Sequence, residues 1–255
     1  MSGRCCSYLF FSQTSVNYRD VKFKGLIFKV STIDREKVKV LNKLVAHYGI
    51  QNWWSDENRI KDWVSMILIQ QTTQENVEKA LAQLDTYLTV DQLHEMEDEK
   101  LQSLIRPAGF YKQKSAYIKE LMTWFVSHGQ DFGKFESYSD ETLRKELLSI
   151  KGVGPETADA MLLYIFNRNV FIGDQYAMRL FKRLGFGEFK NLSHMRREFN
   201  HLTEHVPVEL CKEWHAAIDE HGKVFRKNKN VDESWLFSSS AWKDNLTEYK
   251  KRKLL

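Results

Sequence analysis

Residues 147–162 read LLSIKGVGPETADAML: an apolar helix end, a Gly-Val-Gly turn, and a second apolar segment that starts at Pro155. Pro is favoured at the first position of a helix, so the pattern predicts two helices joined by a tight turn. We expect Gly152 and Gly154 to adopt positive φ, which residues with a Cβ resist. Main-chain N–H groups left unpaired at the start of the second helix, together with its dipole, form a seat for a phosphate. The pattern favours a helix-hairpin-helix that binds a polyanion; a plain connection within a helical bundle is the alternative.

Outside this segment, apolar residues recur at three- and four-residue spacing almost everywhere after residue 34. This periodicity is typical of amphipathic helices and predicts an all-α fold of eight to eleven helices. Ser139 should cap one helix, Pro207 should open another, and Gly222 should end it. The clearest predicted helices cover residues 35–48, 57–70, 74–84 and 114–127.

The composition is that of a globular protein, with 255 residues of which 42% are hydrophobic and 28% charged. No run approaches the ~20 apolar residues of a membrane span, and none suits a secretory signal. We therefore expect a cytoplasmic protein that is not secreted, associated with the nucleoid if the source is bacterial. Cys5, Cys6 and Cys211 cannot supply a four-ligand zinc site or a disulfide framework, so free thiols are expected.

The net charge of +4 is carried by the two ends of the chain. Residues 1–29 hold five Lys or Arg against one Asp, and residues 222–255 hold nine against four acids. The stretch between them is net acidic, with 24 basic and 29 acidic residues. A polyanion would therefore have to bind a local basic patch.

Three further segments accompany the hairpin. Asp174 follows Glu156 by eighteen residues, at an expected helix N-cap in VFIGDQYAMRLFKRLG (170–185). The others are ILIQQTTQENVEKAL (67–81) and IRPAGFYKQKSAYI (105–118). In this order, over about residues 52–222, the four segments resemble the motifs of the helix-hairpin-helix (HhH-GPD) superfamily of base-excision DNA glycosylases. The endonuclease III-like branch is the best match, and within it the 3-methyladenine type that lacks an iron-sulfur cluster.

The resemblance implies an all-α, two-lobed fold with a central DNA-binding cleft. Residues 31–58 and 172–225 would form one lobe, and residues 59–171 the lobe that contains the hairpin. Residues 1–30 would be an N-terminal extension of unknown role, and residues 226–255 a basic tail. The implied partner is double-stranded DNA that contains a damaged base, bound by a monomer with no membrane involved.

The resemblance also assigns roles to residues. Asp174 would stabilise the cationic transition state as the glycosidic bond breaks; an ordinary N-cap is the structural alternative. A flipped base leaves a gap in the stack, which Gln71 would fill from one side and Phe110 or Tyr111 from the other. Core packing is the alternative for both aromatics. The phosphate contacts would come from Lys112, Lys114, Lys151, Gly152, Val153 and Gly154, and Arg179, Lys182 and Arg183 also lie in the family motifs.

Three departures from the family pattern narrow the expected activity. Glu156 stands where bifunctional members have the Schiff-base lysine, so we expect no AP-lyase activity. Met66 stands where the adenine-removing members have an acidic residue. The four positions where relatives carry the cysteines of an iron-sulfur cluster hold Arg226, Glu233, Leu236 and Trp242, so we expect no cluster. A monovalent cation bound at the hairpin is the one cofactor that the resemblance still allows. Without a cluster, packing of Trp235, Phe237 and Trp242 would hold the C-terminal segment.

The expected substrate is an alkylated purine such as 3-methyladenine. Such a base carries positive charge, leaves readily, and stacks well on aromatic rings. Trp53 and Trp54 are the expected stacking residues, with core packing or a helix cap as the alternative for each. Gln74 departs from this type, which has an aromatic residue there. A glycosylase for uracil, thymine or oxidised pyrimidines remains an alternative, as do a non-catalytic protein that binds DNA damage and a helical protein that never contacts DNA.

Overall fold

The computed structural model describes residues 31–54 and 58–237, and every regular element in these ranges is helical, which confirms the predicted all-α fold. The expectations for residues 1–30 and for Trp242 lie outside the described residues. The α-helices are α1 (Thr32–Tyr48), α2 (Arg59–Leu68), α3 (Gln74–Leu84), α4 (Val90–Glu95), α5 (Asp98–Leu104), α6 (Tyr111–Ser127), α7 (Asp140–Ser149), α8 (Pro155–Tyr164), α9 (Gln175–Arg183), α10 (Leu192–Phe199) and α11 (Val208–Lys227). Short 3-10 turns cover Asp85–Tyr87, Arg106–Ala108, Phe132–Ser137, Asn200–Thr203 and Ser234–Leu236.

Side-chain caps set most of the helix starts. Ser139 accepts a hydrogen bond from Thr142 N at 3.1 Å, as predicted. Ser31 caps α1 in the same way, so this helix begins three residues before the predicted start. Asn58 caps α2, and Pro155 takes the first position of α8 as expected. None of the described helices has the length and apolarity needed to cross a bilayer.

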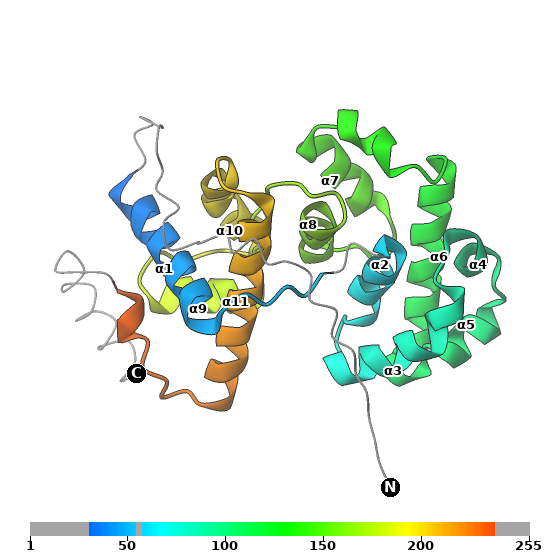
Figure 1. Cartoon of the computed structure of the whole chain (residues 1–255), viewed down its shortest axis with the longest axis horizontal. Helices are drawn as coiled ribbons and strands as arrows, with labels where there is room; N and C mark the ends of the chain where they lie inside the picture. Colours follow the sequence, from blue (N-terminus) through cyan, green and yellow to red (C-terminus); the bar gives the residue numbers. More distant parts are fainter. Residues whose placement is uncertain (1–30, 55–57, 238–255) are drawn as a thin grey trace, which may run out of the picture.

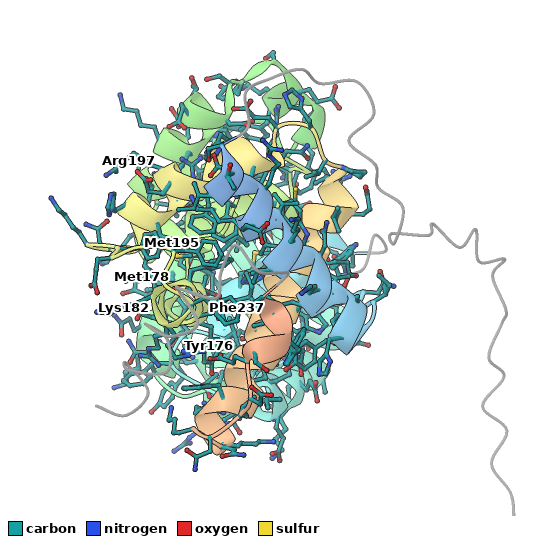
Figure 2. The ribbon with its side chains drawn as sticks, turned by 90° about the vertical axis from the view of Figure 1, so that its left-hand side faces the viewer. Tyr176, Met178, Lys182, Met195, Arg197 and Phe237 are labelled. Atoms are coloured by element: carbon teal, nitrogen blue, oxygen red, sulfur yellow. The ribbon has the colours of Figure 1, made fainter. Side chains whose placement is uncertain are left out.

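The predicted end of α11 at Gly222 is wrong. The helix continues to Lys227, and Gly222 is buried inside it. A Cβ at this position would overlap the ring of Tyr176 on α9, whose side chain is labelled in Figure 2. Gly222 therefore allows α9 and α11 to pack closely, and its role depends on tertiary packing.

The helices gather in two groups (Figure 1). Helix α1 packs along α11 together with α9 and α10, while α2 to α7 surround α6 and the hairpin on the other side. Helix α8, the second helix of the hairpin, touches both α10 and α11 and so lies between the groups. Residues 49–54 lead from α1 toward α2, and residues 165–174 lead from α8 back to α9.

A buried ionic cluster joins α8 to the group of helices formed by α1, α9, α10 and α11. Asp159 of α8 is 2% exposed and accepts from Arg144 Nε of α7 at 2.7 Å, while Arg196 Nε of α10 lies 2.9 Å away. Burial raises the pKa of Asp159, and the two guanidinium groups offset this shift only in part. The hairpin helix is thus tied to the group of helices that carries Asp174.

A second ionic cluster anchors the C-terminal segment. Glu233 is fully buried and accepts from Arg183 Nη2 at 2.6 Å, and its Oε1 lies 2.9 Å from His221 Nε2. Burial alone would raise the pKa of Glu233, but hydrogen bonds from His221 and Arg183 lower it to about 2. Lys43 donates to the carbonyls of Trp235 and Phe237 at 2.9 Å each.

Glu233 stands at one of the four cluster positions, with Leu236 buried and Arg226 exposed at two others. None of these three residues has a thiolate, the usual ligand of an iron-sulfur cluster. Trp235 and Phe237 pack against the core, as expected, with Trp235 stacked on His47 at 4.4 Å. The sequence did not predict the ion pairs of Glu233 or the hydrogen bonds of Lys43, which also anchor this segment.

We expect Glu233→Gln to lower the free energy of unfolding at pH 7 by about 3 kcal/mol, the energy of a pKa shift from 4.5 to about 2. Because the pKa is lowered in the folded state, this stabilisation is complete above about pH 4.5. It is lost as the pH falls toward 2, so the wild type and the variant should converge there. Urea unfolding at several pH values measures this difference.

Glu188→Gln is the matched control. Glu188 pairs with Lys182 at 2.8 Å, but both side chains are largely exposed. Exposed pairs contribute about 0–1 kcal/mol, so this variant should unfold like the wild type. A constant Glu233→Gln deficit from pH 7 to pH 2 would contradict the assignment.

Candidate functional site

The hairpin turn depends on one glycine rather than two. Gly152 has φ +94°, as predicted. The prediction for Gly154 is wrong, because this residue has φ −85° and ψ 176°, an extended conformation open to any residue at a helix N-cap. Gly152 is also needed for space, since a Cβ there would overlap the ring of Tyr117 from α6.

Gln70 braces the turn from outside. Its Nε2 donates to Gly152 O at 3.0 Å and to Thr157 Oγ1 at 3.3 Å. The adjacent residue, Gln71, is exposed and has φ +54°. Phe110 shares both features, with φ +47° and 60% of its surface exposed. Non-glycine residues with positive φ are strained and concentrate at functional sites.

One groove brings the hairpin and these two strained residues together. It has a volume of about 300 Å³ and is lined by Gln70, Gln71, Phe110, Gln113, Lys114, Tyr117, Gly152, Val153 and Gly154. The expected wedge residues therefore face the same space as the expected phosphate seat. Tyr111 is half-buried, 5.7 Å below the guanidinium of Arg106, so Phe110 is the more exposed of the two candidate aromatics.

The expected phosphate contacts divide into two kinds. Lys112 and Lys151 are exposed, and Val153 is buried beneath the turn. The expectation that Lys114 contacts a phosphate is wrong, because its side chain is buried. It is 2% exposed and donates to Leu68 O at 2.7 Å and Ala108 O at 2.8 Å. Burial lowers its pKa, and its ammonium group stabilises the loop before α6 instead of facing DNA. Arg183 is likewise committed to Glu233.

Asp174 occupies the predicted N-cap of α9. Its Oδ1 accepts from Ala177 N at 2.6 Å, and the residue is 5% exposed. The preceding residue must be glycine, because a Cβ at Gly173 would lie 2.6 Å from Leu192 O of α10. The backbone of α10 therefore fixes the place of the carboxylate.

His215 and Tyr164 complete this site and were not predicted. His215 Nε2 lies 3.5 Å from Asp174 Oδ2, and Tyr164 OH lies 2.7 Å from His215 Nδ1. The only sequence signal is the four-residue spacing of His215 and Asp219, which places both on one face of α11. Such spacing is common on solvated helix faces, so it could not single out His215.

The two tryptophans lie next to each other in sequence but differ in environment. Trp53 is 43% exposed, with its ring edge-on to His215 at 6.3 Å and the Lys223 ammonium 4.9 Å from its centroid. Core packing is therefore excluded for Trp53. Trp54 is half-buried and tilted against Tyr164 at 5.7 Å. Both indoles thus approach the Tyr164–His215–Asp174 group.

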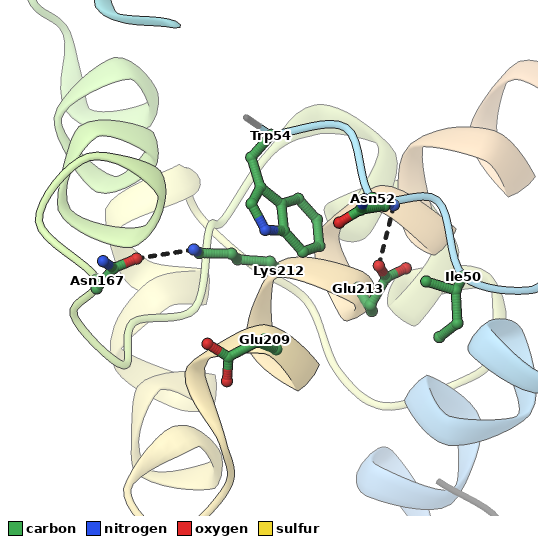
Figure 3. A pocket seen from close by; sticks show the side chains of 7 residues that line it. All are labelled: Ile50, Asn52, Trp54, Asn167, Glu209, Lys212 and Glu213. Carbon is green, nitrogen blue, oxygen red and sulfur yellow. Dashed lines mark hydrogen bonds between the residues drawn. The ribbon is translucent and has the colours of Figure 1, made fainter. Parts of the chain in front are cut away.

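Trp54 also lines a second cavity of about 310 Å³ (Figure 3), whose other side chains are Ile50, Asn52, Asn167, Glu209, Lys212 and Glu213. Lys212 is buried and donates to Asn167 Oδ1 at 2.7 Å. Glu213 accepts from Gln51 N at 2.8 Å and Asn52 N at 3.1 Å. These two hydrogen bonds fix the linker that carries both tryptophans onto α11.

The charge around Asp174 is mainly negative. Glu156 is exposed, yet partial desolvation raises its pKa, Asp174 and Asp219 act in the same direction, and His215 opposes them. Lys223 donates to Asp219 at 2.6 Å and to Glu220 at 2.9 Å. Its burial is outweighed by these bonds, which raise the pKa of Lys223. The site can therefore stabilise a cation, and its lysine is held as an ammonium ion.

We expect Gly152→Ala and Gly154→Ala to differ sharply. The first forces a Cβ residue into φ +94° against Tyr117, so unfolding free energy should fall by about 1–3 kcal/mol and DNA affinity should fall with it. Among residues 31–54 and 58–237, nothing lies within 4 Å of a Cβ at position 154, so the second variant should fold like the wild type. Urea unfolding and fluorescence anisotropy with duplex DNA measure the two effects. Equal stability of the two variants would contradict this account of the turn.

Comparison with known proteins places the chain in a family. Residues 64–205 match the model of the HhH-GPD superfamily base excision DNA repair proteins. A candidate DNA repair glycosylase of Methanocaldococcus jannaschii is 38% identical over 195 residues, which cover 75% of this chain and 89% of that protein.

Solved structures share the fold. The 3-methyladenine DNA glycosylase MagIII of H. pylori, bound to 1,N6-ethenoadenine, superposes with a TM-score of 0.62 at 25% identity, covering 78% of this chain and 99% of that chain. A trapped endonuclease III–DNA covalent intermediate superposes with a TM-score of 0.59 at 22% identity, covering 86% and 98%. The chain therefore belongs to the HhH-GPD superfamily of base excision DNA repair proteins.

Proposed function

We propose that this protein is a monofunctional DNA glycosylase that removes alkylated purines and acts as a monomer on double-stranded DNA. The observation that carries the proposal is the placement of Asp174, a carboxylate fixed at 5% exposure beside the exposed indole of Trp53. His215 lies between them, 3.5 Å from Asp174 and in edge contact with Trp53. The family membership supplies the reaction class, hydrolysis of an N-glycosidic bond.

Asp174 acts on the sugar. As the bond to the base lengthens, positive charge develops on the sugar ring, and a fixed carboxylate stabilises it without reorganising. The Ala177 N–H holds Oδ1, so Oδ2, which has His215 on one side, keeps an acceptor site for the reacting sugar and its attacking water. The N-cap role and the catalytic role use different oxygens and coexist.

The groove beside the hairpin opens the duplex. Gln71 and Phe110 fill the gap left by the flipped nucleotide, which offsets part of the few kcal/mol lost in unstacking. The N–H groups of Gly152 to Gly154, with Lys151 and Lys112, bind the phosphates, and the exposed Arg179 of α9 extends the basic surface. These contacts position the DNA without reading its sequence.

The absence of an amine at position 156 supports a monofunctional reaction. Glu156 cannot form a Schiff base. Lys223, which lies over Trp53, is bonded to Asp219 and Glu220 and stays protonated, so it is a poor nucleophile. Lys212 donates to Asn167 and lies over Trp54.

The charge of the site supports a cationic base. Asp174 and Asp219 lie close enough to Glu156 to raise its pKa. A methylated purine bearing positive charge is attracted to these acids, and it gains about 0.5–2 kcal/mol on the face of Trp53. MagIII of H. pylori is a 3-methyladenine glycosylase in name, which agrees with this substrate class. Gln74 takes no part, since it is exposed and donates to Glu78 at 3.3 Å.

A monovalent cation at the hairpin suits the chemistry of the turn. The turn offers only main-chain oxygens, and hard oxygen donors suit such ions better than transition metals. Ile150 O and Gly152 O already accept from Val153 N and Gln70 Nε2 at 3.0 Å each, so a cation would share them with these donors. Bound there, it would add positive charge next to a phosphate. An iron-sulfur cluster does not fit, because Arg226, Glu233 and Leu236 supply none of the thiolates that would hold it.

Base release from defined DNA tests the proposal. We expect the wild type to release 3-methyladenine and 7-methylguanine from methylated duplex DNA, and not uracil, thymine glycol, or adenine opposite 8-oxoguanine. Asp174→Asn should lower the rate by about 10²–10³-fold, because a neutral amide cannot stabilise the cation. Chromatography of the released bases measures both effects.

Asn is as good an N-cap as Asp, so Asp174→Asn should stay folded and lose no more stability than its contact with His215 provides. Release of pyrimidines alone would sink the alkylation assignment. Tight binding without release of any base, or an unchanged rate in Asp174→Asn, would favour a damage-binding protein instead.

The monofunctional assignment has a separate test at position 156. Borohydride should trap no covalent complex between the wild type and DNA containing an abasic site. Glu156→Lys restores an amine at this position, and we expect a trapped adduct from this variant. Glu156→Gln is the matched control without an amine. Trapping by the wild type and Glu156→Gln alike would show that another lysine acts as a lyase.

A further inference from the structure

We propose that His215 is a positioning residue for the catalytic carboxylate: held by Tyr164, it directs an N–H at Oδ2 of Asp174. The inference rests on the proposed function, because it assumes that Asp174 stabilises the sugar cation. His215 Nε2 lies 3.5 Å from Oδ2, and the opposite ring nitrogen, Nδ1, lies 2.7 Å from Tyr164 OH.

Contacts on several sides hold the imidazole. The ring of Tyr164 packs against it with centroids 5.7 Å apart, and Trp53 meets it edge-on at an interplanar angle of 84°. His215 lies on α11 two residues after Glu213, whose carboxylate accepts hydrogen bonds from the linker at Gln51 and Asn52. A side chain merely resting on a helix surface would have solvent in place of these neighbours.

Tyr164 determines which nitrogen carries the proton. Burial, followed by the charges of Glu213, Asp219 and Asp174, raises the pKa of Tyr164 well above its usual value, so it stays a phenol. When His215 is neutral, the phenol donates to Nδ1 and the remaining proton lies on Nε2. When His215 is protonated, Nδ1–H donates to the phenol oxygen and the phenol donates to Lys212 O, 3.3 Å away. In both states an N–H faces Asp174.

Charged groups surround Asp174 on several sides. Glu156 and Tyr164 approach from α8, Asp219 comes from α11, and Lys223 lies over the ring of Trp53. Asp174 and Asp219 act on Glu156 as like charges. An N–H directed at Oδ2 is the favourable neighbour for Asp174 among these groups, and with Ala177 N on Oδ1 it limits the rotation of the carboxylate.

The test compares His215→Phe with His215→Gln. Phe keeps the ring but removes the donor, whereas the Gln amide nitrogen lies near the place of Nε2. Single-turnover release of methylpurines from tritium-methylated duplex DNA should slow about tenfold to hundredfold in His215→Phe. Most of the rate should return in His215→Gln. Affinity for a duplex with a tetrahydrofuran abasic site should be unchanged in both.

Rescue by Gln separates positioning from stability. His215→Phe and His215→Gln should differ in rate by more than they differ in the equilibrium constant of unfolding, because only Gln returns the donor. His205→Phe is the matched control, because His205 is exposed and its Nε2 lies 3.9 Å from Glu204. It should leave the rate as in the wild type.

A double-mutant cycle tests the contact independently of turnover. His215→Phe and Asp174→Asn should be non-additive in the equilibrium constant of unfolding at pH 7, by about tenfold. A His215→Phe rate equal to that of the wild type, or a His215→Gln rate as low as that of His215→Phe, would overturn the inference. If the wild type releases no base at all, the proposed function fails instead, and additive effects in the cycle would then overturn the contact itself.

Discussion

The position of the hairpin relative to Asp174 depends on the buried charge of Asp159. This residue lies one turn into α8, and its two arginine partners come from α7 within the hairpin and from α10 beside Gly173. Removing one partner from a buried ion pair typically costs about 3–5 kcal/mol, because the remaining charge stays buried. The hairpin turn and Asp174 belong to different groups of helices, and this cluster joins them. Under the proposed function, DNA bound at the hairpin would thereby meet Asp174 at a fixed position.

Features that depend on nearby residues were predictable from sequence. The caps at Ser139 and Asp174, the start of α8 at Pro155, and the positive φ of Gly152 follow from local backbone chemistry. Features set by distant neighbours were not. Gly222 lies inside α11 because the ring of Tyr176 fills the space that a Cβ would need. Lys114 points inward because its ammonium group donates to two buried carbonyls. His215 gains its importance only when α8, α9 and the linker converge on it.

Charged groups supply much of what holds the C-terminal segment in place. A loop after the last helix has few apolar residues to bury and needs strong local bonds. Here Glu233 is bound by Arg183 and His221, His221 is bonded to Tyr48 at 2.8 Å, and Lys43 holds two carbonyls of the loop. These hydrogen bonds and ion pairs form without a metal and do not depend on the redox state of the surroundings. They depend on pH, because the carboxylate must be ionised.

Under the proposed function, the left-handed backbone at Gln71 and Phe110 has a consequence for how lesions are found. Both backbone conformations are set in the folded protein before any DNA is met. A wedge whose backbone is preset would enter most readily where a base pair is already weakened. The search along DNA would then be biased by the local strength of base pairing, before any base reaches Trp53. Recognition would have two stages, first the mechanical stability of the duplex and then the charge of the extruded base.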